Sequence, residues 1–314
     1  MPPETRTLSD AVCLGCACLC DDVRLTIAGR RVESVEGGCP EAAGWFTQPI
    51  VPAEDACFIA GQPASLAEAT AAAAELLTAE RSPVVAGLAG VSVEAQRLAV
   101  AIADRIGGGV VGGDTAGDGA ALAQAVASHG AVTATLGEAA QRADRIVFWR
   151  CDPAATHPRH FDRFSLQPTS EWLPRGRADR TVYAIGSPST RTAAAADHVI
   201  PLEPERDYEA FGVLHALAQG VALDPAAVRT ATGVELADWR RLADALAGGR
   251  YAAVFYDELF SALSDNRRTT TGAVSLGALT GWLAELQTTT RAAALPLGAR
   301  RYRSNAVGAS NVLA

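Results

Sequence analysis

The alternation of apolar and polar positions changes along the chain, and each change predicts a different element. Across Asp22–Glu36, apolar residues recur at about every second position on both sides of a Gly29-Arg30 turn, which predicts a β-hairpin. From Ser65 the spacing becomes helical. Ser65 and Glu68 fit a capping box, so we expect an Ala-rich helix to about residue 80. A second helix is expected over Ser92–Ile106.

Short runs of β-branched and aromatic residues between helical stretches predict buried strands. Strands are expected at Pro83–Leu88, Arg145–Trp149, Thr181–Ile185 and Tyr251–Phe255, and further helices at Ala120–His129, Asp207–Gly220, Asp238–Ala247 and Leu276–Leu286. Because strands that alternate with helices pair in parallel, the predicted fold class is α/β, with doubly wound parallel sheets. Ligands of such sheets bind beyond the carboxyl ends of the strands, here in the loops after Leu88, Trp149 and Ile185.

Domain organisation follows from the same pattern. We expect an N-terminal cysteine-rich module over residues 1–60, an α/β domain over residues 61–205, and a second α/β portion over residues 206–314 that completes the core. With 314 residues and 49% hydrophobic side chains, the chain is long and apolar enough to bury a sizeable core.

Composition excludes several partners. The formal net charge of −8 and the pI of about 5.2 leave no basic surface for nucleic acid. Apolar runs stop short of the ~20 residues that a membrane span needs, and the polar N-terminus does not resemble a secretory signal, so a cytoplasmic protein is expected. In that reducing compartment, seven cysteines are expected as thiols or metal ligands rather than disulfides.

The first candidate site is a cluster of cysteines near the N-terminus. Cys13, Cys16, Cys20 and Cys39 give the spacing C-x2-C-x3-C-x18-C. Three thiolates on one loop suit a 4Fe-4S cluster, and zinc is the alternative metal because it also binds C-x2-C pairs. Cys18 lies on the same loop as an extra residue.

Two further candidate sites follow predicted strands. After Trp149 the chain carries Arg150 and Asp152 and then His157-Pro158-Arg159-His160, whose imidazoles could bind a metal, transfer protons, or form a hydrogen-bonded loop. After Ile185, a polar segment runs through Thr190 to Pro204-Glu205-Arg206-Asp207.

Taken in order, these motifs resemble the B subunit of formylmethanofuran dehydrogenase, a shortened relative of the molybdopterin oxidoreductases. The residues that carry the resemblance are Cys13–Cys20 with Asp21-Asp22, the Trp149–His160 loop, Thr190–Ala193 with Ala196-Asp197, and Pro204–Asp207. The resemblance implies a 4Fe-4S cluster on the four thiolates and later loops that hold the guanine nucleotide arms of the pterin. Molybdenum or tungsten would be bound by a cysteine in the loop after the second helix.

The sequence departs from that pattern at four places. The loop that should supply the metal-binding cysteine contains Asp114 and Asp118 but no sulfur ligand. Arg150 and Asp152 stand where the family has Gly and Asn, and Glu205 stands where it has Gly, so bulk and negative charge oppose a phosphate. The chain also stops at Ala314, within a segment that the family carries further.

These departures make the chain more similar to the B subunit of the formyltransferase/hydrolase complex of methylotrophic bacteria. The first hypothesis is therefore a non-redox assembly subunit that is not itself catalytic, binds no molybdopterin and contacts A-, C- and D-type subunits. The second is an active dehydrogenase subunit with a Mo or W pterin and a 4Fe-4S cluster, in which Asp114 or Asp118 supplies an oxygen ligand. The third is an electron-transfer subunit that keeps only the cluster.

Overall fold

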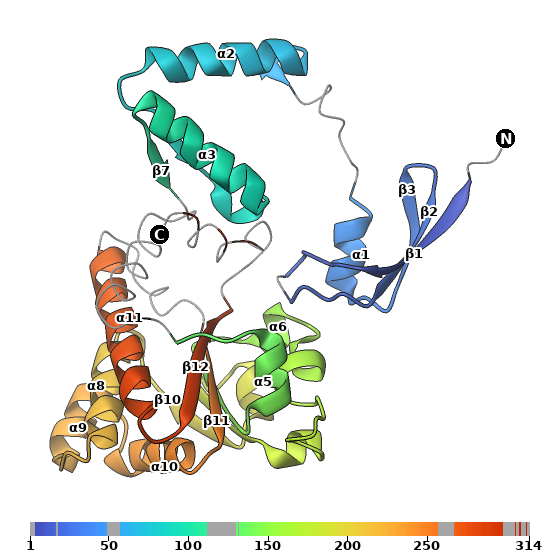
Figure 1. The fold of residues 1–314 in the computed structure, drawn as a ribbon. Helices are drawn as coiled ribbons and strands as arrows, with labels where there is room; N and C mark the ends of the chain where they lie inside the picture. Colours follow the sequence, from blue (N-terminus) through green and yellow to red (C-terminus); the bar gives the residue numbers. More distant parts are fainter. Residues whose placement is uncertain are drawn as a thin grey trace. The chain divides into compact units, whose positions relative to one another are not determined.

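A computed structural model describes residues 4–16, 18–48, 57–111, 130, 132–256, 267–297, 305, 308 and 312, without the side chains of 267–274. The chain divides into two compact units, Met1–Asp114 with Arg300–Ala314, and Thr115–Ala299 (Figure 1). The boundaries expected near residues 60 and 205 stay predictions. Among the described helices, none has the combination of length and apolar character that a membrane span requires.

The N-terminal module is a three-stranded antiparallel sheet in the order β1-β2-β3, followed by a short helix. Its elements are β1 (Thr5–Ala11), β2 (Val23–Ala28), β3 (Arg31–Glu36) and α1 (Pro40–Phe46). The predicted hairpin is confirmed, and Gly29 adopts φ 57° at its turn, as a glycine can without strain. Strand β1 was not predicted, because six of its seven residues are exposed and show no apolar periodicity.

Residues 57–111 form two small sheets and two helices. Their elements are β4 (Phe58–Ile59), β5 (Gln62–Pro63), α2 (Leu66–Ala79), β6 (Val84–Ala86), a 3-10 turn (Leu88–Gly90), α3 (Val93–Ile106) and β7 (Gly109–Val111). Both predicted helices are confirmed, and the capping box of Ser65 with Glu68 is present. The strand expected at Pro83–Leu88 exists as β6, but the expectation that it is buried is wrong: two of its three residues are exposed.

The second unit contains a five-stranded parallel sheet in the order β10-β9-β8-β11-β12. The strands are β8 (Arg145–Trp149), β9 (Thr181–Gly186), β10 (His198–Pro201), β11 (Tyr251–Tyr256) and β12 (Arg291–Pro296). From β8 the chain adds β9 and then β10 on one side of β8. It then returns and adds β11 and β12 on the other side of β8. The fold class is therefore doubly wound α/β, and its topological switch point lies between β8 and β11, where ligands of such sheets bind.

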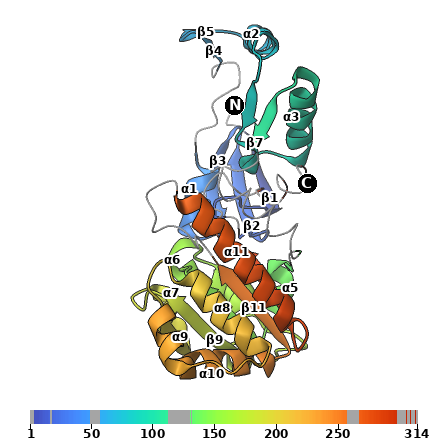
Figure 2. The same ribbon diagram turned by 90° about the vertical axis from the view of Figure 1, so that its left-hand side faces the viewer.

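Helices cover both faces of this sheet (Figure 2). The helical segments described in this unit are α5 (Leu136–Arg142), α6 (Pro153–Thr156), a π-helical segment (Phe161–Ser165), a 3-10 turn (Gly176–Asp179), α7 (Arg191–Ala195), α8 (Asp207–Ala218), α9 (Pro225–Thr232), α10 (Leu236–Ala247) and α11 (Arg267–Leu286). One core packs α8, α9, α10 and α11 on the sheet, and the other packs α5 and the π-helical segment on the opposite face.

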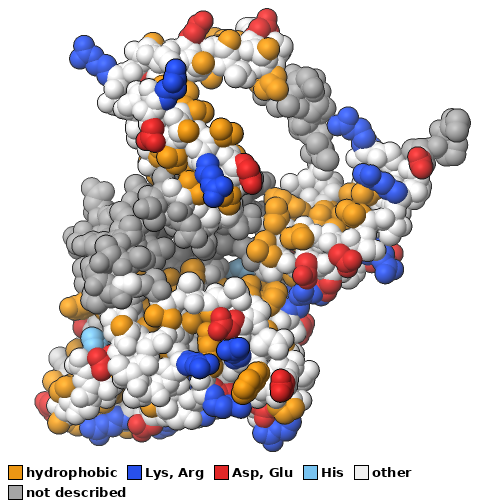
Figure 3. Space-filling model, viewed as in Figure 1, with side chains coloured by type: hydrophobic (Ala, Val, Ile, Leu, Met, Phe, Trp, Pro, Cys, Tyr) orange, Lys and Arg blue, Asp and Glu red, His pale blue; other side chains and the backbone are white. Residues whose placement is uncertain are grey.

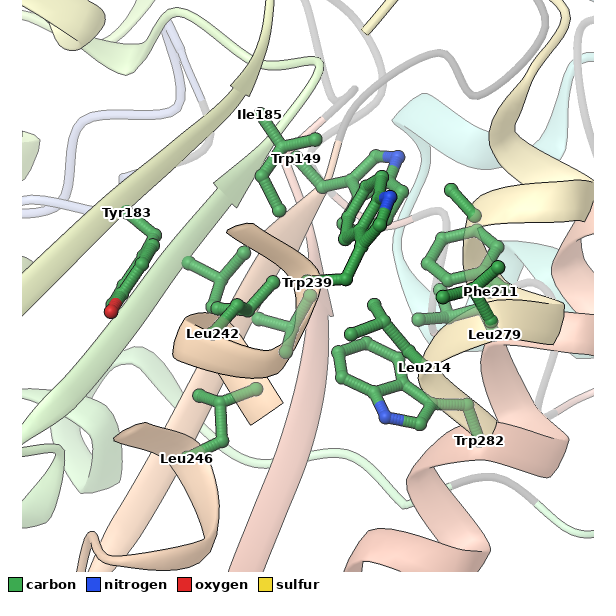
Figure 4. Packing of buried hydrophobic residues seen from close by; sticks show 14 of the residues in the cluster. Trp149, Tyr183, Ile185, Phe211, Leu214, Trp239, Leu242, Leu246, Leu279 and Trp282 are labelled. Atoms are coloured by element: carbon green, nitrogen blue, oxygen red, sulfur yellow. The ribbon is translucent and has the colours of Figure 1, made fainter. Parts of the chain in front are cut away.

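Aromatic side chains form the centre of the larger core (Figure 4). Trp149, the last residue of β8, stacks on Phe211 of α8 with ring centroids 4.2 Å apart. The ring centroids of Trp239 and Trp282 each lie 6.3 Å from that of Trp149. All four rings are at most 1% exposed, so burial of this cluster fixes the end of β8, from which the next loop begins.

One part of the predicted ligand crevice is wrong. The loops after Trp149 and Ile185 follow neighbouring parallel strands, β8 and β9, and share one edge of the sheet. The loop after Leu88 does not belong to this edge, because β6 pairs with β7 in a separate two-stranded sheet. The third helix expected at Ala120–His129 and the loop with Asp114 and Asp118 lie outside the described residues.

Candidate functional site

Arg150 lies at the carboxyl end of β8 and binds acceptors from a distant part of the chain. Its Nε donates to both carboxylate oxygens of Asp207, at 2.7 and 2.8 Å. Its Nη1 donates to the carbonyl oxygen of Leu202 at 3.2 Å, and its Nη2 to that of Glu203 at 2.6 Å. The indole Nε1 of Trp149 donates to Asp207 at 2.7 Å. The loop after β8 is thereby joined to the segment between β10 and α8.

This ion pair is buried. The side chains of Arg150 and Asp207 are 13% and 3% exposed. Burial raises the pKa of the Asp207 carboxyl above its ordinary value, although the charge of Arg150 opposes that shift. A buried carboxylate needs such a partner, because an isolated charge there would cost several kcal/mol. Arg150 is therefore the counter-ion that makes Asp207 tolerable in the core.

Asp152 binds the first backbone amides of α7. Its Oδ1 accepts from the backbone N–H and the hydroxyl of Thr192 at 2.9 and 2.7 Å, and its Oδ2 accepts from the Arg191 N–H at 3.2 Å. Thr190, the N-cap of α7, accepts from the N–H of Ala193 at 3.0 Å. Free backbone N–H groups at a helix start attract anions. Here a carboxylate from the chain itself takes that position.

The two predicted histidines are buried and oriented by hydroxyl groups. His160 lies 2.9 Å from Ser165 through its Nδ1, and the Ser165 hydroxyl donates to the carbonyl oxygen of His160 at 3.3 Å. We infer that Nδ1 carries the hydrogen, which leaves Nε2 as a buried lone pair without a hydrogen-bond partner among the described residues. His157 is held in the same way by Thr156, at 2.8 Å. This geometry is that of a hydrogen-bonded loop.

Burial also sets the charge of His160. Its side chain is completely buried against aromatic rings, including Phe255 at a centroid distance of 4.8 Å. Desolvation, with a smaller contribution from neighbouring His157, lowers the pKa of His160 to about 3. The imidazole is therefore neutral at physiological pH and cannot act as a general acid at that pH.

Two other predicted residues of these loops, Glu205 and Arg159, are more exposed than the two histidines. Glu205 is exposed and adopts φ 72°, a left-handed conformation that glycine adopts without strain. Its carboxylate adds negative charge just before Asp207. Arg159 lies half-buried between the two histidines of its loop.

The cysteines of the N-terminal loop lie close together. The N–H of Cys13 donates to the carbonyl oxygen of Cys20 at 2.8 Å, which closes the loop. Cys13 experiences the charges of Cys16, Cys20 and Cys39, and burial is the main reason that its pKa is raised. Cys16, Cys20 and Cys39 are thus within electrostatic range of Cys13.

Cys18, which we expected to be an extra residue, lies inside this cluster. It is 2% exposed. Hydrogen bonding with the side chains of Cys16 and Cys20 raises the pKa of Cys18, and the same contact lowers the pKa of Cys16 to about 7. In the described part of the chain, however, no three Cys, His, Asp or Glu side chains are placed to hold one metal ion. The 4Fe-4S cluster or zinc ion at Cys13, Cys16, Cys20 and Cys39 stays a prediction.

The residues at the sheet edge do not fit the guanine nucleotide arm of a pterin. Arg150 fills the space beside Asp207, and Asp152 binds the amides at the start of α7 that a phosphate would need. Sequence reasoning identified Arg150, Asp152 and Asp207 as site residues. It missed Trp149, which donates to Asp207, and Thr192, which donates to Asp152. The position of Trp149 next to Arg150 at a strand end was the only sequence signal for the contact of Trp149 with Asp207.

Comparisons with known proteins test the family resemblance. No protein-family model matches the chain. The B subunit of tungsten-containing formylmethanofuran dehydrogenase 2 from Methanococcus maripaludis is 29% identical over 245 residues, which covers 74% of this chain and 56% of that protein. The protein of the same name from Methanocaldococcus jannaschii is 28% identical over 227 residues, or 69% of this chain and 52% of that protein. The resemblance to the B subunit of formylmethanofuran dehydrogenase is confirmed. The chain spans about half the length of these relatives.

Solved structures extend the resemblance. The formyltransferase/hydrolase complex FhcABCD from Methylorubrum extorquens, in complex with methylofuran, matches with a TM-score of 0.54 at 25% identity. That match covers 76% of this chain and 59% of the other. Acetylene hydratase from Pelobacter acetylenicus matches with a TM-score of 0.50 over 72% of this chain and 33% of the other. At 12% identity the second likeness concerns the fold alone, and it supports the predicted fold class.

Proposed function

We propose that the chain is a non-redox assembly subunit of a formyltransferase/hydrolase complex of one-carbon metabolism, and that it is not itself catalytic. Its partners would be the other subunits of that complex, of A, C and D type. This proposal accords with the likeness to the FhcABCD complex and to the B subunit of the dehydrogenase. Transfer and hydrolysis of a formyl group remove no electrons from the substrate, so such a complex needs no molybdenum or tungsten.

One observation supports the non-redox role most directly. At the carboxyl edge of the sheet, the loop after β8 is held by the chain's own side chains: Arg150 binds Asp207, which follows β10, and Asp152 binds the start of α7, which follows β9. A guanylated pterin would have to displace a buried ion pair and an internal carboxylate before its nucleotide arm could bind. Glu205 adds a negative charge that repels its phosphates.

A second candidate is an active dehydrogenase subunit. It is favoured by the identity of 28–29% to subunits of tungsten-containing enzymes. In that case Asp114 or Asp118 would ligate the metal through oxygen, and both residues lie outside the described part of the chain. The two candidates differ in metal content and in the need for an electron acceptor.

The decisive experiment is elemental analysis of the intact assembly purified without oxygen. We expect molybdenum and tungsten far below one atom per chain, and formyl transfer that proceeds without reduction of a viologen dye. Roughly one atom of molybdenum or tungsten per chain would establish the dehydrogenase instead. Fluorescence of oxidised pterins released by acid provides an independent readout of the organic part of the cofactor.

Iron and zinc measured in the same sample test the cysteine cluster. We propose that a metal held there binds through Cys13, Cys16, Cys20 and Cys39. The matched variants are Cys20→Ser in the buried cluster and Cys57→Ser outside it. We expect the first to lower the iron or zinc content of the assembly and the second to leave it unchanged. An equal metal content in both variants would exclude the site.

A further inference from the structure

We propose that the face of the second unit around Trp172 binds an acidic segment of a partner subunit. We define this Trp172 face by Trp172 together with Arg142, Arg175 and Arg250, all of which are exposed. The inference rests on the proposed function, because a docking segment requires the other subunits of the complex. It goes further by assigning a surface and the chemistry of the segment that fits it.

Trp172 is 54% exposed although its loop is fixed in place. Its N–H donates to the Oγ of Ser170 at 3.2 Å, and the Ser170 hydroxyl donates to the carbonyl oxygen of Gln141 at 2.7 Å. The Nη2 of Arg250 donates to the carbonyl oxygen of Trp172 at 2.8 Å, and the next residue, Leu173, is fully buried. Because this backbone is already ordered, covering the indole with a partner would cost little conformational entropy.

A hollow lies beside Trp172. It has a volume of about 490 Å³ and is lined by Trp172 and by residues of α5, which are Gly137, Glu138, Gln141 and Arg142. Gly137 contributes no side chain that could fill this space. A single exposed tryptophan on a flat surface would need no explanation, but a tryptophan at the wall of such a hollow can anchor side chains of another chain.

The exposed charge of the Trp172 face is mainly positive. The side chains of Arg175 and Arg250 are 73% and 59% exposed, and Arg142 is exposed as well. The carboxylates with which two of them pair are shielded: the side chain of Asp179, beside Arg175, is 11% exposed, and that of Asp144, beside Arg250, is 8% exposed. Figure 3 shows basic side chains gathered at one end of α5, in the same view as Figure 1.

The remaining carboxylates do not cancel this charge. Glu138 is half-buried and forms a hydrogen bond with Tyr251, and Glu171 is exposed in the loop that carries Trp172. Three exposed guanidinium groups therefore face one exposed carboxylate. The chain as a whole carries a net charge of −8, which repels a long polyanion such as nucleic acid, whereas a local excess of arginine attracts a short acidic protein segment.

The fitting segment follows from these contacts. It has an apolar side chain that packs on Trp172 in the hollow, and Asp or Glu residues beside it that pair with Arg142, Arg175 and Arg250. Tryptophan and arginine are the residue types that most often dominate the energy of protein interfaces. We therefore expect Trp172 to be the anchor and the arginines to select an acidic partner.

The test uses variants of the full-length chain, affinity-tagged and purified with its coexpressed partner subunits. Trp172→Ala removes the anchor, and Arg142→Glu reverses an exposed charge. We expect each to raise the apparent Kd of at least one partner subunit roughly tenfold or more, measured by mass photometry as the assembly is diluted. Arg142→Glu should also weaken the dependence of that Kd on NaCl concentration.

The matched controls lie on the opposite face of the sheet. Tyr208→Ala removes a 52% exposed aromatic ring from α8, and Arg229→Glu reverses a charge on α9 whose side chain is 70% exposed. Helices α8 and α9 pack on the other side of the sheet from α5, so both variants should retain the partner subunits as wild type does.

Hydroxyl-radical footprinting of the wild-type assembly needs no variant. Trp172 should be oxidised several-fold more slowly in the assembly than after salt has dissociated the subunits, and Tyr208 should react equally in both. Unchanged retention in Trp172→Ala and Arg142→Glu, equal weakening by the controls, or equal reactivity of Trp172 in both states would overturn the inference. Binding of a single-stranded RNA oligonucleotide that is lost in Trp172→Ala would also overturn it, because the face would then serve another class of partner.

Failure of the inference can be told apart from failure of the proposed function. Molybdenum or tungsten in a wild-type assembly that releases a subunit on Trp172→Ala would overturn the non-redox role and support the docking surface. An assembly that lacks both metals but is unaffected by either variant would overturn the docking surface alone. A wild-type chain that retains no partner subunit would overturn both.

Discussion

Individual polar residues at the carboxyl edge of the parallel sheet are paired with groups far away in the sequence. Arg150 and Asp207 are 57 positions apart, and Asp152 and Thr192 are 40 apart. Each pair joins the loop after β8 to a later segment of the chain, so removal of either member leaves a partner unsatisfied. An unsatisfied buried donor or acceptor costs more free energy than an intact hydrogen bond contributes. These residues are therefore where single substitutions should have the largest polar effects.

Asp152→Ala should destabilise the second unit. It removes the acceptors of the Thr192 amide and hydroxyl and of the Arg191 amide, and we expect the free energy of unfolding to fall by about 1–3 kcal/mol. Urea unfolding followed by tryptophan fluorescence measures this, since three buried tryptophans lie in the core of that unit. The matched control is Asp244→Ala, whose carboxylate is exposed on α10. Equal stability of the two variants would refute the role of Asp152.

His160 should make stability depend on pH. Its folded pKa of about 3 lies below the ordinary value of 6.5, so the unfolded chain binds the proton first. The contribution of His160 to the free energy of unfolding should therefore be constant above pH 6.5 and should fall as the pH drops from 6.5 toward 3. At pH 5 the loss attributable to this group is about 2 kcal/mol.

The pH effect of His160 can be isolated with His160→Asn. An asparagine can keep the donor to Ser165 but does not titrate, so the difference in unfolding free energy between pH 7 and pH 5 should shrink. The control is His215→Asn, since the His215 side chain is 36% exposed. An unchanged pH dependence in His160→Asn would show that folding does not lower the pKa of His160.

At the scale of elements, sequence patterns predicted the strongly periodic segments and missed the weak ones. Helices α2, α3, α8, α10 and α11 and strands β8, β9 and β11 were predicted, because capping residues or continuous apolar runs mark them. Strand β10 was interpreted as part of a polar loop, since it is a short edge strand that ends in Pro201. Strand β12 is rich in alanine, which has low strand propensity, and pairing with β11 is what makes it a strand.

Only those parts of the candidate site that local sequence patterns mark could be predicted. The sequence located the loops after β8 and β9 and the histidine pair, because strand ends and short motifs are local signals. It did not indicate that Arg150 binds Asp207, because that contact depends on the order β10-β9-β8 in the sheet. Cys18 was set aside on spacing alone, although the loop closed by Cys13 and Cys20 brings it among the other thiols.

Packing of α8 on the sheet should dominate the stability of the second unit. Phe211 is fully buried and stacks on Trp149, so Phe211→Ala should cost about 3–5 kcal/mol through lost burial and a cavity. Tyr208 lies on the same helix but is 52% exposed, and Tyr208→Ala should cost less than about 0.5 kcal/mol. Denaturant midpoints of the two variants measure the contrast. A similar cost for both would mean that α8 does not pack as described.

At the scale of the whole molecule, the two units differ in how well their helices are buried. Helices α8, α10 and α11 pack apolar side chains into a common core, whereas α2 has no buried residue along its 14 positions. Figure 3 shows apolar side chains on the surface of α2 and α3. Four large ones are more than two fifths exposed: Leu66, Leu76, Leu98 and Ile102. An isolated chain with such surfaces tends to aggregate.

Expression of the chain alone should therefore yield mainly aggregated protein, and coexpression with the other subunits of the proposed complex should recover it in a soluble assembly. Leu76→Gln with Leu98→Gln should raise the soluble yield of the isolated chain, because both side chains are about two thirds exposed. Glu75→Gln, an exposed polar change on the same helix α2, is the matched control and should leave the yield unchanged. Size-exclusion chromatography with light scattering distinguishes the outcomes. A stable, monodisperse monomer of the unaltered chain would contradict the proposal that it depends on partner subunits.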